Sequence, residues 1–75
     1  MKLSDGQNGK TYIVRAIDLE LKVKSRLEVL GMTANSKVEI LNSKKSGTRI
    51  IKVRGTRFAL GGAFAKNIEI EEVGV

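Results

Sequence analysis

Hydrophobic residues recur at every second position along much of this chain, which is the spacing of strands that bury one face. Val38 and Ile40 alternate with Lys37 and Glu39, and a similar alternation returns near the end of the chain. Three further runs are rich in β-branched and aromatic residues, which also favours strands. The pattern predicts five short strands, over residues 10–17, 37–41, 48–54, 57–60 and 68–71.

One segment breaks this pattern, because its apolar positions recur at the spacing of a helix. It lies between the first two predicted strands, and we expect its apolar stripe to pack against the sheet. Asp18 is the expected N-cap, with Ser25 as an alternative, and Gly31 is the expected left-handed residue that ends the helix. The stripe consists of Leu19, Val23, Leu27 and Leu30.

Segments rich in polar residues and glycine separate the remaining strands. Residues 42–47 indicate a loop, Gly55 and Thr56 a tight hairpin turn, and residues 63–67 one helical turn of the tighter 3₁₀ type. Five strands and one helix in 75 residues predict a single domain over residues 1–75. The expected fold class is all-β, a small SH3-like barrel with one α-helix inserted after the first strand.

The composition narrows the chemistry. The chain has no cysteine and no histidine, so disulfides, the usual zinc ligands and the common catalytic triads are excluded. Glu69 and Glu71 share one side of a predicted strand, but such glutamates usually keep an edge soluble. No glycine-rich phosphate loop is present. We therefore expect no enzyme activity, no catalytic residue, no cofactor and no metal site.

The chain shows neither a signal-peptide pattern nor the roughly 20 consecutive apolar residues that span a bilayer. We therefore expect a cytoplasmic protein without membrane insertion.

The net charge of +6 is unevenly distributed, because residues 44–57 contain basic side chains and no acidic one. Such a segment is either a solvated face or a docking surface for an acidic partner. The basic residues are Lys44, Lys45, Arg49, Lys52, Arg54 and Arg57.

A nucleic-acid-binding barrel is the rival interpretation of this basic segment. Stacking on bases needs exposed aromatic rings, and the chain has only Tyr12, Phe58 and Phe64. We expect Phe58 to fill the barrel and Phe64 to plug one end. The rival interpretation is therefore the weaker one, and nucleic acid is not the expected partner.

A protein partner would need exposed apolar residues. Leu21 and Val29 lie off the helix stripe, and together with Met32 they could form a small apolar patch with Lys22 and Arg26 at its rim. In the alternative, Met32 covers the mouth of the barrel. The sequence leaves both open.

These features together resemble the FeoA family of ferrous iron transport proteins. The resemblance rests on the order and spacing of short apolar and glycine motifs over nearly the whole chain. The motifs are Arg26-Leu27, Leu30-Gly31-Met32, residues 37–40, the hairpin through Gly55, Phe58-Ala59-Leu60-Gly61 and residues 65–70, with Gly6 and Gly9 in the opening turn.

The chain departs from the family in two places. Ala34 and Asn35 stand where members often have proline and glycine, and we expect Asn35 to adopt the left-handed conformation that a glycine would supply. Gly61 and Gly62 stand where many members carry a polar residue such as arginine.

The resemblance implies a cytoplasmic accessory or regulatory protein of ferrous iron uptake. Such a protein would bind the cytoplasmic part of the membrane GTPase-permease, lie at the inner membrane through that partner, and bind no iron itself. The resemblance also implies a general association of the family with transition metal ions, but no residue of this chain is expected to bind one. Weak self-association remains open. The expected partner-binding residues are Leu21, Lys22, Arg26, Val29, Gly31 and Met32.

Overall fold

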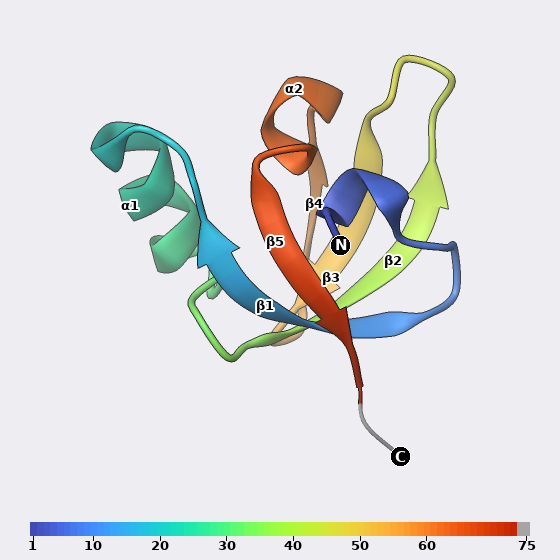
Figure 1. Cartoon of the computed structure of the whole chain (residues 1–75), viewed down its shortest axis with the longest axis horizontal. Coiled ribbons are helices and arrows are strands. Elements are labelled where there is room, and N and C mark those ends of the chain that lie inside the picture. The colour runs from blue at the N-terminus through green and yellow to red at the C-terminus, as the bar shows by residue number, and fades with distance from the viewer. Residues whose placement is uncertain (74–75) are drawn as a thin grey trace.

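The computed structural model describes residues 1–73, whose strands form one antiparallel five-stranded sheet. The sheet order is β4-β3-β2-β1-β5, so that β4 and β5 form its two edges. The sheet curls into an open barrel with α1 at its side, which confirms the predicted all-β class and the inserted helix (Figure 1). The strands are β1 (Thr11–Ile17), β2 (Lys37–Ser43), β3 (Arg49–Val53), β4 (Thr56–Leu60) and β5 (Ile68–Glu72).

The helical segments are η1 (Leu3–Asp5), α1 (Leu21–Val29) and α2 (Gly62–Ala65). Glu20 is the N-cap of α1, so the predictions of Asp18 and of Ser25 as the cap were wrong. The backbone N–H of Asp18 donates instead to the carbonyl of Asn67 at 2.8 Å. This bond ties the end of β1 to the turn before β5, and the helix begins only after it.

The end of α1 lies where the glycine predicts it. Gly31 has a φ of 102°, and its N–H donates to the Glu28 carbonyl at 2.9 Å. The Met32 N–H donates to the Leu27 carbonyl, also at 2.9 Å. These two bonds satisfy carbonyls in the last turn of the helix, as a left-handed C-terminal residue allows.

Most of the predicted stripe of α1 packs against the core. Leu27 is buried, and Leu19 and Val23 are half-buried against the core. Leu30, the C-cap residue, is 37% exposed, so its predicted place in the stripe was wrong.

The core lies inside the curled sheet, on its inner face. Across β2 and β3, Val38 is paired with Val53 and Ile40 with Ile51, and all four side chains are fully buried. Each such side chain contributes about 1.5–3 kcal/mol of hydrophobic stabilisation. The buried hydrophobic residues are Leu3, Tyr12, Val14, Leu27, Met32, Val38, Ile40, Ile51, Val53, Leu60, Ala65, Ile68 and Ile70.

Two end residues differ from expectation. Leu3, in a helical turn that the sequence did not predict, is fully buried. Phe64 is 41% exposed, so the prediction that it plugs one end of the barrel was wrong. Phe58 is half-buried against the core, as expected for a residue that helps to fill the barrel.

Two predicted boundaries and one predicted helix type also differ from the structure. The hairpin turn is formed by Arg54 and Gly55, with φ of 50° and 82°, and Thr56 already belongs to β4. β2 continues to Ser43, through the first part of the predicted loop. α2 is α-helical rather than 3₁₀, because Ala65 donates to the carbonyl four residues earlier.

Candidate partner-binding surfaces

The outward side of α1 carries the largest exposed apolar side chains of the helix. Leu21 is 77% exposed and Val29 is 88% exposed. They lie eight residues apart, which is about 12 Å along the helix axis, and within the same half of its circumference. Lys22 and Arg26 are exposed on the same helix, and neither forms an ion pair with any residue between 1 and 73. The structure therefore brings four of the six expected partner-binding residues onto one exposed helix.

Met32 does not belong to this surface, because its side chain is fully buried in the core. The alternative prediction, that Met32 closes the barrel mouth, is the one that its burial supports. Ser36, which the sequence did not single out, is buried beside this segment and donates through its hydroxyl to the Gly31 carbonyl at 3.1 Å. Its hydroxyl also accepts from the Thr33 N–H at 3.2 Å. A short loop is thus fixed directly after the helix.

Gly31, at the end of α1, packs against Arg54 of the β3–β4 turn. A Cβ added at Gly31 would lie 3.2 Å from Cδ and 3.4 Å from Cβ of Arg54, so the aliphatic part of the Arg54 side chain covers this glycine. Arg54 therefore lies next to the end of α1, which joins one predicted basic residue to the neighbourhood of the helix.

The basic residues do not form one continuous face. Lys52 and Arg57 are cross-strand partners on β3 and β4, and both are exposed. Lys44 and Lys45 lie in the β2–β3 loop, which Figure 1 shows on the opposite side of the molecule from α1.

Arg49 is half-buried and turned toward the protein, where its guanidinium donates to the Ser43 hydroxyl and to the Ser4 carbonyl. Its Nε is buried without a partner in the described part of the chain. Arg49 is therefore a structural residue at the start of β3, and the expected basic face divides into two groups.

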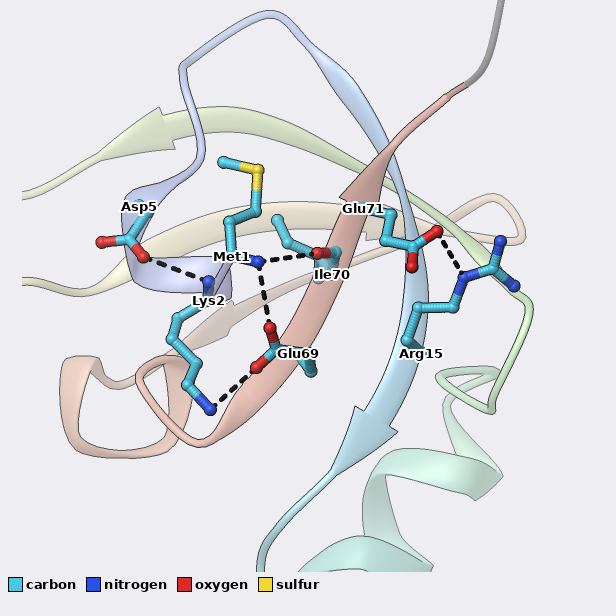
Figure 2. Close-up of polar contacts among 7 residues, drawn as sticks. All are labelled: Met1, Lys2, Asp5, Arg15, Glu69, Ile70 and Glu71. Carbon is cyan, nitrogen blue, oxygen red and sulfur yellow. Dashed lines mark hydrogen bonds and ion pairs between the residues drawn. The ribbon is translucent and has the colours of Figure 1, made fainter.

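Two acidic residues of β5, Glu69 and Glu71, form ion pairs with basic groups of the same chain (Figure 2). Glu69 accepts from the Met1 ammonium at 3.0 Å and pairs with Lys2 Nζ at 2.8 Å. The hydrogen bond from Lys2 lowers the pKa of Glu69, and the same hydrogen bond raises the pKa of Lys2. Glu71 accepts from Arg15 Nε at 2.9 Å.

Asn35 adopts the left-handed conformation expected of it, with a φ of 72°. Its side-chain oxygen accepts from the Arg15 guanidinium at 2.8 Å, and its N–H donates to the Val14 carbonyl at 2.7 Å. Asn35 thus supplies the left-handed conformation that a glycine would otherwise provide, and the turn is kept. Gly62 also has a structural reason, because a Cβ there would lie 3.1 Å from the Gly47 carbonyl oxygen of the β2–β3 loop.

The described residues contain no group of three His, Cys, Asp or Glu side chains placed to hold a metal ion. Within residues 1–73 there is no pocket of ligand size. Neither helix in this part of the chain combines the length and apolar character that crossing a membrane requires. Within residues 1–73, the outward side of α1 carries the two most exposed large apolar side chains, Leu21 and Val29, with basic residues on the same helix.

Fold and surface together define a class: a small SH3-like barrel whose inserted helix exposes two large apolar side chains. The family model for the FeoA domain matches residues 1–72, so the chain belongs to the FeoA family. No curated protein matches this chain.

Solved structures agree with this assignment. A crystal structure of an iron uptake regulatory protein (FeoA) is 29% identical, with a TM-score of 0.87, and the match covers 97% of each chain. The FeoA of Stenotrophomonas maltophilia, complexed with zinc, is 26% identical with a TM-score of 0.79, over 95% of this chain and 89% of that one. It is described as a prokaryotic SH3 domain protein and a candidate ferrous iron transport activating factor. The SH3-like fold is thereby confirmed.

A third structure shares the fold. The FeoA protein of Chlorobium tepidum has a TM-score of 0.92 at 24% identity, and the match covers 99% of this chain and 71% of that one.

Proposed function

We propose that this chain is a non-enzymatic accessory protein of ferrous iron uptake. In this proposal it acts in the cytoplasm, binds the cytoplasmic part of a GTPase-coupled iron permease, and regulates or assembles that transporter. Family membership supports the link to iron transport. The description of one similar protein as an iron uptake regulatory protein supports a regulatory role.

The observation that carries the proposal is the exposure of Leu21 and Val29 on α1. Large aliphatic side chains at this exposure leave apolar surface in water, and a partner that covers them gains the corresponding hydrophobic free energy. Lys22 and Arg26 provide the polar rim that surrounds the apolar centre of most protein interfaces. Gly31 contributes by fixing the end of this helix, whereas Met32, which is buried in the core, is not part of the proposed contact.

The test is co-purification of the chain with the permease from membranes, using the double variant Leu21→Asp and Val29→Asp. The wild-type chain is expected to be retained, and the double variant is expected to be lost. Met32 is left unchanged, because an aspartate in the core would unfold the protein. Retention of the folded double variant at the wild-type level would contradict the proposal.

A control is Phe64→Asp, which introduces one aspartate, against two in the double variant, at a partly exposed apolar residue on α2. This variant is expected to co-purify like the wild type. Circular dichroism of all three proteins shows whether each one is folded.

A further inference from the structure

The two edges of the sheet differ in whether their backbone groups are used. Along β5, the Ile70 N–H donates to the Met1 carbonyl at 2.7 Å, and the backbone of Lys2 forms an antiparallel β-bridge with Glu69. Figure 2 shows the Met1 ammonium beside the Ile70 carbonyl and the Lys2 side chain paired with Glu69. The outer edge of β5 is therefore partly paired by the start of the chain. β4 is the other edge, and its only neighbouring strand within residues 1–73 is β3.

The β3–β4 turn determines which groups of β4 point outward. Val53 pairs with Thr56 across two residues that both have positive φ, which is the geometry of a type I′ hairpin. In that hairpin the residue pair next to the turn is hydrogen-bonded, and the following pairs are alternately non-hydrogen-bonded and hydrogen-bonded. Phe58 and Leu60 therefore bond to β3, whereas Arg57 and Ala59 direct their N–H and C=O groups away from the sheet.

These outward groups have no partner in the described chain. No hydrogen bond outside the sheet joins the backbone of Arg57 or Ala59 to another part of residues 1–73. Both residues are exposed. Unpaired donors and acceptors at regular spacing along an exposed strand are a template for a further strand.

The charge around this edge favours an acidic occupant. Residues 40–68 contain no aspartate or glutamate, so the whole β3–β4 hairpin is free of acidic side chains. Lys52 and Arg57 lie side by side across the two strands, and Arg54 forms the adjacent turn. A second copy of the same edge would bring further positive charge, whereas an acidic segment would be complementary.

We propose that the free edge of β4 binds an extended, acidic segment of a partner protein by strand addition. Main-chain hydrogen bonds to Arg57 and Ala59 hold the segment, and its carboxylates lie beside Lys52 and Arg57. This surface is distinct from the outward side of α1 and does not depend on the proposed binding of the permease.

The test is a titration of the full chain, followed by NMR of its backbone amides, with a peptide of alternating Glu and Thr about ten residues long. The expected result is a shift and slowed hydrogen exchange of the Arg57 and Ala59 amides. Arg57→Glu is expected to weaken the binding by about tenfold or more. Lys22→Glu makes the same charge change on α1 and is expected to leave the binding unchanged.

Two further samples separate strand addition from simple charge attraction. Ala59→Pro removes one outward N–H without changing the charge or the bonds to β3, and it is expected to abolish binding. A Glu–Thr peptide that is N-methylated at its glutamates keeps the charge but lacks the N–H groups that face β4 when the glutamates lie beside Lys52 and Arg57, and it is expected not to bind. Equal binding of the two peptides, no response at Arg57 and Ala59, or pairing of β4 between copies of the chain without peptide would each overturn the proposal.

Discussion

The outer edges of β5 and β4 differ in whether their backbone groups and charged side chains have partners. β5 is partly covered by Met1 and Lys2, and the acidic side chain of Glu69 is matched by their positive charges (Figure 2). β4 has no such cover within residues 1–73, and none of its basic neighbours forms an ion pair there, although Glu39 lies opposite Lys52 on β2. The comparison teaches that, of the two edges, the one with unpaired backbone groups also has basic side chains without an ion pair.

The largest predicted effect is on the free energy of unfolding, for two side chains of unequal burial, one on each edge strand. Ile70 of β5 is fully buried, so Ile70→Ala is expected to lower the free energy of unfolding by about 2–5 kcal/mol. Thr56 of β4 is exposed, so Thr56→Ala is expected to change it by less than about 0.5 kcal/mol. Urea denaturation of the two variants measures both values, and similar losses would contradict the difference in burial between these two side chains.

A smaller effect is expected where the β3–β4 turn meets α1. Gly31→Ala places a side chain at a φ of 102° and against Arg54, and it is expected to cost about 1–2 kcal/mol. Gly9→Ala is the matched control, because Gly9 has a φ of 82° with no neighbouring atom within 4 Å. The control is expected to cost less in thermal denaturation. An equal cost would mean that the contact with Arg54 is unimportant.

The smallest effect concerns the ion pairs that cover β5. The pKa of Glu69 is lowered in the folded chain, so its contribution is present above the ordinary glutamate value of about 4.3 and is lost as the pH falls through the lowered value. The pKa of Lys2 is raised, so its contribution is present at neutral pH and is lost as the pH rises through the raised value.

When Glu69 is protonated in acid, Lys2 loses its ion-pair partner, and the NMR signals of Lys2 are expected to shift. Glu69→Gln is expected to remove this shift. The signals of Arg57 on the open edge serve as the internal control, because no described carboxylate pairs with it. A Lys2 titration in acid that is unaltered in Glu69→Gln would contradict the assigned pair.

The regular parts of the fold were predictable because their periodicity is strong. Val38 and Ile40 alternate with charged residues, and their burial follows directly from that alternation. Gly31 identified the end of α1 because few other residues tolerate its backbone conformation. The start of α1 was not predictable, because it depends on the hydrogen bond between Asp18 and Asn67, which are far apart in the sequence.

The candidate surface was predictable only in part. The helical spacing separated Leu21 and Val29 from the buried stripe, and both are exposed. Met32 lies after the helix, where periodicity no longer indicates direction, and it is buried. The inward turn of Arg49 depends on Ser4 and Ser43, and no local pattern reports such contacts. The difference between the two edges likewise depends on strand order, which periodicity does not reveal.

Amide hydrogen exchange of the unliganded chain tests the contrast between the two edges most directly. The account predicts that the Ile70 amide, which donates to the Met1 carbonyl, exchanges slowly. It predicts that the Arg57 and Ala59 amides exchange fast, while the Phe58 amide between them is protected by β3. Equal protection of Arg57, Phe58 and Ala59 would show that the β4 edge is already covered and would contradict the account.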